Sequence, residues 1–159
     1  MSRILVTGGA GYIGSFAVRA LAAAGHDVVV YDSLAQGHAE SIAWLNAAAP
    51  GRPPIALVTG DIRDRAKVRQ TLEAHRIEAV MHFAAWLLVG ESVKDPISYY
   101  DNNVGGALSV LSAMAEVGVP AFIFSSTAAT FGEPRTAPID EDHPQRPINT
   151  YGETKLAIE

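Results

Sequence analysis

The sequence has no cysteine, no excess of basic residues and no long apolar run. Without cysteine, neither a disulfide scaffold nor thiolate chemistry is available. Lys and Arg number 12 against 17 Asp and Glu, which gives a formal net charge of −5. No basic surface is therefore expected to hold nucleic acid or an anionic membrane. The longest apolar run, 83–89, is far shorter than the roughly 20 residues that cross a bilayer.

The N-terminal apolar run 4–6 is interrupted at once by Thr7-Gly8-Gly9, which leaves no room for the core of a signal peptide. The five His residues include no pair at ligand spacing on a shared helix or turn, so no metal site is predicted. The 159 residues are 48% apolar, as expected of one globular domain. We predict a cytoplasmic protein whose partner is a small molecule, not nucleic acid or a membrane.

Short β-rich runs alternate with helical patterns, which is typical of a parallel sheet with crossover helices. Apolar residues recur at helical spacing from Ile13 to Leu21, and Gly25 is placed to end that helix. Val68 and Leu72 mark another helix. The expected fold class is α/β, a doubly wound parallel sheet with helices on both faces. Its strands are predicted at 4–7, 28–32, 55–59, 79–82 and 121–125.

A further helix is predicted over 96–117, because Asp95 can cap it and Pro96 suits its first position. The pair Gly105-Gly106 falls inside this helix and costs about 1 kcal/mol per Gly relative to Ala. We therefore expect close packing against a neighbour at that point. Residues 132–149 contain four Pro residues and no sustained period, which predicts a surface loop.

The turn after the first strand has glycines at its first, fourth and seventh positions, Gly8, Gly11 and Gly14. Such glycines allow a sharp turn, close approach of a pyrophosphate and packing of the helix on the strand. Asp32 ends the second strand, where an acid accepts hydrogen bonds from the adenosine ribose and repels a 2′-phosphate. The motif predicts a Rossmann-type site that prefers NAD to NADP. Three glycines at these offsets arise by chance in roughly one such sequence in ten.

Tyr151 and Lys155 stand at i and i+4, on one face of a helix predicted to begin near Tyr151. A phenol acts as a base near neutral pH where a positive charge stabilises its phenolate, and the Lys155 ammonium can supply that charge. Ser125-Ser126-Thr127 ends the last strand, at the edge where such sheets bind ligands, so Thr127 is placed to donate to the oxygen on which Tyr151 acts. The alternatives are an exposed helix start and strand-end capping.

Together these motifs resemble the extended short-chain dehydrogenase/reductase family, and within it the sugar-nucleotide 4-epimerases. The resemblance implies that UDP-glucose and UDP-galactose are interconverted through a 4-keto sugar with tightly bound NAD, a reaction of galactose metabolism. The alternatives are an epimerase for UDP-glucuronate or UDP-N-acetylglucosamine, and a non-catalytic NAD-binding module. The matching segments are 7–14, 60–63, 82–85, 89–93, 99–104, 124–132 and 151–155.

The resemblance also implies roles for individual residues. Tyr151 would take the proton of the sugar 4-hydroxyl, Thr127 would orient that oxygen, and Lys155 would hold the nicotinamide ribose. From the residues alone, Asp61 could instead cap a helix, Phe83 could be sheet core and Asn102 could be solvated. The implied cofactor-binding residues are Gly8, Gly11, Tyr12, Ile13, Gly14, Asp32, Ser33, Asp61, Ile62, Phe83, Ala84, Ala85, Asn102, Ser125, Tyr151 and Lys155.

At four positions, the residues of this chain differ from those that particular members of the family carry. Ala128 and Ala129 stand where sugar-nucleotide 4,6-dehydratases carry an Asp-Glu pair, which eliminates water, so their absence favours epimerisation. Leu87 stands where many epimerases carry a Lys that contacts the cofactor, and Phe131 replaces their usual Tyr.

Family members continue for about as long again as this chain. Residues 1–159 are therefore expected to be an NAD-binding domain that is incomplete at its C-terminal end, without the substrate domain, and to have little or no epimerase activity alone. The resemblance further implies a homodimer formed through the helix at 96–117 and its neighbour.

Overall fold

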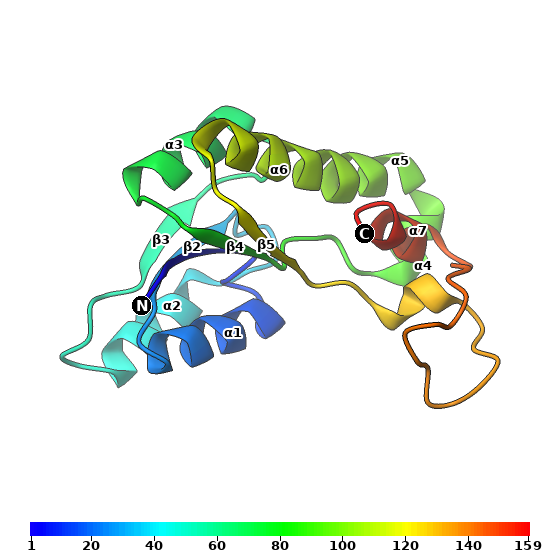
Figure 1. Cartoon of the computed structure of the whole chain (residues 1–159), viewed down its shortest axis with the longest axis horizontal. Coiled ribbons are helices and arrows are strands. Elements are labelled where there is room, and N and C mark those ends of the chain that lie inside the picture. Colours follow the sequence, from blue (N-terminus) through cyan, green and yellow to red (C-terminus); the bar gives the residue numbers. More distant parts are fainter.

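The computed structural model describes residues 1–159 and contains one five-stranded parallel sheet between two layers of helices (Figure 1). The strand order is β3-β2-β1-β4-β5, so the first strand lies at the centre. Every predicted strand is confirmed to within one residue at each end. The strands are β1 (Arg3–Thr7), β2 (Asp27–Asp32), β3 (Ala56–Thr59), β4 (Ala79–His82) and β5 (Ala121–Phe124).

The register brings the carboxyl ends of the strands level with one another. Thr7 pairs with Tyr31 of β2 on one side and with His82 of β4 on the other, and His82 pairs in turn with Phe124 of β5. The loops after these strands therefore emerge at the same edge of the sheet, which is where ligands bind in open parallel sheets.

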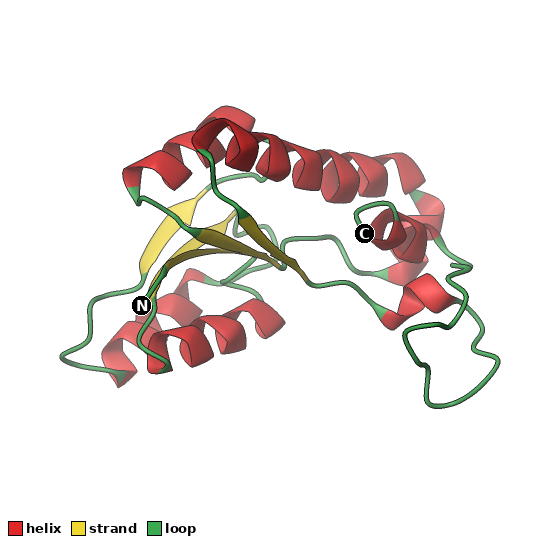
Figure 2. Ribbon diagram, in the orientation of Figure 1, coloured by secondary structure: helices red, strands yellow, loops and turns green.

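Helices cover both faces of the sheet, as predicted (Figure 2). On one face, α1 (Tyr12–Ala23) and α2 (Ala39–Ala48) pack with the strands around a cluster that includes Val18 and Ile42. On the other face, α3 (Arg65–Ala74) and α6 (Gly106–Val117) bury Leu72 and Val110. Helix α2 was not predicted, because its apolar residues do not mark a single face: Trp44 is exposed beside the buried Ile42.

The helix predicted over 96–117 consists of three consecutive segments. It begins as predicted, with the Asp95 carboxylate accepting a hydrogen bond from Ser98 N at 3.2 Å, and comprises α5 (Pro96–Tyr99), a π-helical segment (Tyr100–Gly105) and α6. A continuous α-helix was therefore the wrong prediction in the middle of this range. The expected close packing is confirmed at Gly106, where a Cβ atom would lie 2.4 Å from Ile62 Cδ1.

Three short elements complete the chain: α4 (Val89–Lys94), a 3-10 turn (Ala128–Phe131) and α7 (Thr150–Leu156). Between the last two, residues 132–149 form the irregular, mostly exposed loop that the prolines predicted, and this loop projects from the body of the molecule (Figure 1). No helix has both the length and the apolar character that a membrane span requires.

Candidate functional site

The glycine-rich turn after β1 is built so closely that two of its positions have no room for a side chain. Gly8 has a φ of +71°, and a Cβ atom there would lie 2.5 Å from Ala84 N. A Cβ atom on Gly14 would lie 2.1 Å from Gly8 O. These glycines therefore let the turn pass close to the segment after β4 and let α1 pack against the turn.

Helix α1 presents an uncapped N-terminus at this turn. Its N-cap residue is Gly11, which has no side chain to accept a hydrogen bond, and the N–H groups of Tyr12 and Ile13 have no acceptor within the protein. Free N–H groups and the helix dipole together favour a bound anion such as a phosphate group.

Asp32 connects the turn with the loop that follows β2. Its carboxylate is only 7% exposed and accepts hydrogen bonds from Ala10 N at 3.0 Å and from Leu34 N at 2.9 Å. Each oxygen keeps a further lone pair, because a carboxylate oxygen accepts more than one hydrogen bond. The acid predicted from the sequence thus lies beside the glycine-rich turn and holds its backbone.

Lys155 is buried at the opposite side of the site, with 3% exposure. Its Nζ donates to Ser125 O at 2.9 Å and lies 4.7 Å from the centroid of the Phe124 ring and 5.9 Å from that of Tyr151. Burial lowers the pKa of Lys155 to about 8. The alternative of an exposed helix start is therefore wrong for this residue.

The start of α7 is fixed by two polar side chains. Asn149 caps the helix, since its Oδ1 accepts a hydrogen bond from Gly152 N at 2.8 Å. Ser92 of α4 is fully buried, and its Oγ accepts from Tyr151 N at 3.1 Å. Because α4 follows β4, this contact brings Tyr151 to the edge at which the strands end.

Thr127 caps the 3-10 turn that follows β5. Its Oγ1 accepts a hydrogen bond from Ala129 N at 3.2 Å, so the capping role considered from the sequence is present. The hydroxyl proton remains free to be donated, because accepting that bond uses only a lone pair. Capping and donation to a ligand are therefore compatible at Thr127.

The structure decides between the alternatives at three other residues. Helix α3 is capped by Asp64, which accepts from Lys67 N at 3.0 Å, and not by Asp61. Hydrogen bonds from Arg63 are the main reason that the pKa of Asp61 is lowered. Asn102 is buried and not solvated, whereas half-buried Phe83 both packs against the core and lines the cavity described next.

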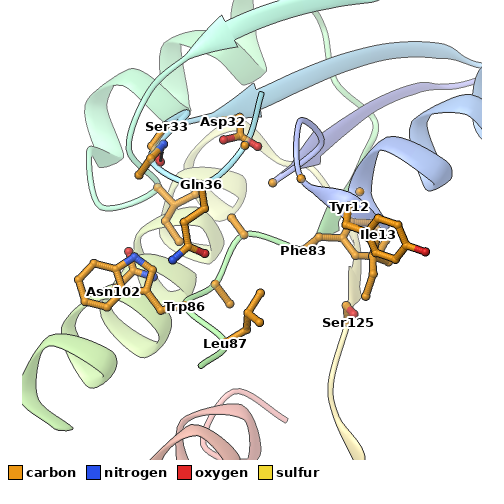
Figure 3. A pocket seen from close by; sticks show the side chains of 18 of the residues that line it. Tyr12, Ile13, Asp32, Ser33, Gln36, Phe83, Trp86, Leu87, Asn102 and Ser125 are labelled. Atoms are coloured by element: carbon orange, nitrogen blue, oxygen red, sulfur yellow. Dashed lines mark hydrogen bonds between the residues drawn. The ribbon is translucent and has the colours of Figure 1, made fainter. Parts of the chain in front are cut away.

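One cavity of about 540 Å³ is lined by every residue that the sequence predicted for cofactor binding or catalysis. Figure 3 shows Asp32 and Ser33 on the side of β2, and Ser125 where β5 ends. Sequence reasoning missed Gln36 and Trp86, although each follows a predicted segment within a few residues. The remaining lining residues that were not predicted for binding or catalysis are Tyr31, Ala35, Gly37, Gly60, Leu87 and Ser126.

Comparison with known proteins gives a family for this arrangement. Residues 5–159 match the family model described as GDP-mannose 4,6 dehydratase. The chain belongs to this family. Within the GDP-mannose 4,6-dehydratase family, the chain is 51% identical over 158 residues to the UDP-glucose 4-epimerase of Rhizobium meliloti, covering 99% of this chain and 45% of that protein. The resemblance to sugar-nucleotide epimerases is thus confirmed.

Solved structures give the same result. The UDP-glucose 4-epimerase of Brucella ovis in complex with NAD has a TM-score of 0.90 at 44% identity, covering 99% of this chain and 46% of that one. The enzyme of Stenotrophomonas maltophila, with bound NAD and formylated UDP-arabinopyranose, has a TM-score of 0.95 at 39% identity and the same coverage. The chain therefore spans a little under half the length of these relatives.

Proposed function

We propose that residues 1–159 form the NAD-binding domain of an enzyme that interconverts UDP-glucose and UDP-galactose. The observation that carries this proposal is the single cavity in which the glycine-rich turn and Asp32 face the set Thr127, Tyr151 and Lys155. Identity near 50% to UDP-glucose 4-epimerases supports the same activity.

The cavity suits a dinucleotide on physical grounds. The turn leaves no room for a Cβ atom at Gly8 or Gly14, and the N-terminus of α1 offers N–H groups to a diphosphate. The buried Asp32 carboxylate would accept from ribose hydroxyls and would repel a 2′-phosphate, which favours NAD over NADP.

A bound nicotinamide dinucleotide would supply the group that accepts hydride from the sugar and returns it. In the proposed reaction, Tyr151 in its phenolate form takes the proton of the sugar 4-hydroxyl, and Thr127 donates a hydrogen bond to the same oxygen. With a pKa of about 8, Lys155 is mostly charged at neutral pH and stabilises the Tyr151 phenolate.

The residues beside Thr127 favour epimerisation over the dehydration for which the family model is named. Ala128 and Ala129 follow Thr127 directly and carry no acid or base. Elimination of water needs an additional acid and base, whereas proton exchange at a single hydroxyl needs only the Tyr151 phenol.

We also propose that the whole enzyme is a homodimer that associates through α5 and α6. Ile97 of α5 is 80% exposed and Leu108 of α6 is 58% exposed, so this helical stretch turns apolar side chains outward. Apolar side chains exposed together are typical of surfaces that bind another protein.

The cofactor assignment is tested by calorimetric titration of the purified chain with NAD and with NADP. We expect saturable NAD binding, and NADP binding weaker by at least about tenfold, since a charged 2′-phosphate would approach Asp32. Asp32→Asn should reduce this preference, because it removes the charge and keeps the side-chain shape. Asp27→Asn, at the half-buried start of the same strand and outside the cavity lining, is the matched control and should leave it unchanged.

The reaction is tested by adding UDP-galactose to the NAD-loaded chain and following NADH absorbance. A signal that Tyr151→Phe abolishes would support the epimerase proposal. NAD binding with no signal would favour a non-catalytic module for these 159 residues. Equal affinity for NAD and NADP, or no NAD binding, would contradict the cofactor assignment itself.

A further inference from the structure

The side chain of Lys155 is buried, yet its ammonium group has a single hydrogen-bond partner. Nζ donates to Ser125 O at 2.9 Å and takes part in no ion pair with a carboxylate. An ammonium has three N–H donors, and a buried charge is costly unless other groups compensate it. The charged form that the proposed reaction requires therefore needs a further source of stabilisation.

Two aromatic rings lie close to this ammonium. Nζ lies over the ring of Phe124, 4.7 Å from its centroid, and 5.9 Å from the centroid of the Tyr151 ring. The face of an aromatic ring carries partial negative charge and attracts a cation within about 6 Å of the centroid, more strongly where water is excluded. Phe124 is well inside that range and Tyr151 is at its limit, so Phe124 is the stronger partner.

The alternation of side chains along β5 puts the ring in this place. Successive side chains point to opposite faces of a strand, so Phe122 and Phe124 share one face, and their nearly parallel rings have centroids 6.3 Å apart. The residue after Phe124 is Ser125, whose carbonyl accepts from Lys155 Nζ. Consecutive residues at the end of β5 thus offer a ring face and a carbonyl to the same ammonium.

The titratable groups around Lys155 do not take over the role of the ring. His82 faces the ammonium from β4, and burial holds the pKa of its imidazole far below neutral pH, so it carries no charge. Tyr151 lies on α7 itself, and Lys94 of α4 is exposed. The carboxylates on and around α7 are bonded to other side chains; they are Glu91, Asp101, Glu153 and Glu159.

We propose that Phe124 is a positioning residue whose ring face holds the Lys155 ammonium beside Tyr151 and keeps it in its charged form. Phe124 does not line the cavity and acts through Lys155. This inference rests on the proposed function for its meaning, because the charge matters through the Tyr151 phenolate. The ionisation of Lys155 can nevertheless be measured without NAD or sugar, so the two proposals can fail separately.

The test follows the ionisation of Lys155 in the full chain by NMR, with ¹³C at Cε of lysine and a titration of pH. The chain has three lysines, and the exposed Lys67 and Lys94 serve as internal references. Lys155→Arg removes one signal and so assigns it. In the unaltered chain we expect Lys155 to titrate near pH 8, because burial lowers its pKa.

Phe124→Leu keeps an apolar side chain and removes the ring face. We expect the pKa of Lys155 to fall by about one unit, because the charged form loses its attraction to the ring. At a pKa near 7, only about half of the molecules would carry the charge at pH 7. Loosened packing would act in the opposite direction, since water that reached Nζ would raise this pKa. The sign of the shift therefore separates attraction from packing.

Pentafluorophenylalanine in place of Phe124 tests the same attraction with little change of shape, and it decides the matter if Phe124→Leu does not fold. Fluorine withdraws charge from the ring face, so the pKa of Lys155 should fall again. Phe124→Tyr keeps the ring face and should titrate as the unaltered chain does. Phe122→Leu is the matched control, because it removes the neighbouring ring, which has no contact with the ammonium.

Three results would overturn the proposal. They are a Lys155 pKa that does not fall with the fluorinated ring, an equal fall in Phe122→Leu, and an unaltered chain in which Lys155 titrates like Lys67. Calorimetry with NAD on the same samples reports separately on the proposed function. A chain that fails to bind NAD can still show the shift of the Lys155 pKa.

Discussion

His82, at the end of the central pair of strands, has only one partner for its two ring nitrogens. Nδ1 lies 2.7 Å from Thr7 Oγ1, whereas the buried Nε2 has no hydrogen-bond partner. The ring lies against Phe122 and Phe124. Burial, and secondly the charge of Lys155, lowers the pKa of His82 to about 3. The imidazole therefore stays neutral at every pH at which the protein is expected to work.

This lowered pKa predicts that the chain loses stability in mild acid. Between about pH 6.5 and pH 3, the unfolded chain binds a proton at His82 that the folded chain does not bind. The free energy of unfolding should therefore fall as the pH falls, by about 1.4 kcal/mol per pH unit below pH 6. Urea unfolding at several values between pH 7 and pH 5 measures this slope.

His82→Asn is the control for that slope, because it keeps a polar atom near Thr7 and does not titrate. This variant should be less stable at pH 7 but should show a smaller loss between pH 6 and pH 5. The lowered pKa of Asp61 acts in the same direction only below its ordinary range near pH 4, outside this window. Equal slopes in both proteins would contradict the role assigned to His82.

Leu87 provides a second prediction for a single residue. It is exposed and lines the cavity. By the resemblance to the family, it stands where many epimerases carry a Lys that contacts the cofactor. Leu87→Lys should bind NAD about two- to fivefold more tightly, because an exposed ionic contact contributes at most about 1 kcal/mol. Calorimetry at low and at high salt measures the gain, which should shrink as salt screens the charges.

Leu88→Lys adds the same charge one residue further along, outside the set of cavity-lining residues. It should leave the NAD affinity unchanged. If both variants bound NAD more tightly to the same degree, the gain would come from net charge and not from a contact at Leu87.

Single residues also show where prediction from sequence ends. The i, i+4 spacing was enough to place Tyr151 and Lys155 together. The burial of Lys155 was not predictable, because its partner Ser125 O lies 30 residues away in the sequence. Asn103 lies in a segment that matches the family, but its hydrogen bonds were not predictable, since they depend on Trp86 and Thr154 meeting in space.

At the scale of elements, the glycine-rich turn and α1 work as one unit. A Cβ atom on Gly14 would lie 2.1 Å from Gly8 O, so Gly14→Ala must push the helix away from the turn. We expect a loss of about 1–3 kcal/mol in the free energy of unfolding. NAD affinity should fall by at least about tenfold, because the N–H groups of α1 would no longer face the diphosphate. Thermal unfolding and calorimetry measure the two effects.

Gly90→Ala is the matched control, since a Cβ atom at this position in α4 meets nothing within 4 Å. It should not lower either stability or NAD affinity. A Gly14→Ala variant that bound NAD as tightly as the Gly90→Ala variant would show that the turn is not the diphosphate site.

Elements were predicted well where the chain carries clear start and stop signals. Asp95 and Pro96 gave the start of α5, and Gly25, with a φ of +87°, follows the end of α1. The π-helical segment was missed because an inserted residue in a helix leaves no mark on composition. Helix α2 was missed because few of its apolar residues are buried.

The whole molecule should associate if α5 and α6 form the proposed dimer surface. Leu108→Glu would place a charge on that surface and should shift the protein from dimer to monomer. Sedimentation velocity over a range of concentrations measures this change. Gln70→Glu, which adds a charge on the exposed side of α3, should leave the dimer intact.

A monomeric unaltered protein at every concentration would contradict the dimer proposal for these 159 residues, as would a Leu108→Glu variant that stays dimeric.

The overall class of fold was predictable, since the alternation of short strands with helices leaves few topologies for a parallel sheet. The cavity was predictable in outline for the same reason, since most of its motifs follow strand ends.

The central place of β1 also affects how the chain is made. β1 leaves the ribosome before the other four strands and can pair with β2 soon afterwards, but its other edge waits for β4. Thr7 meets His82 only after 75 further residues have been added. Until then, the edge formed by Ile4, Leu5 and Val6 is unpaired and can bind a chaperone or a second nascent chain. Of the strand edges that are paired in the finished sheet, this one thus remains open to other chains for the longest part of synthesis.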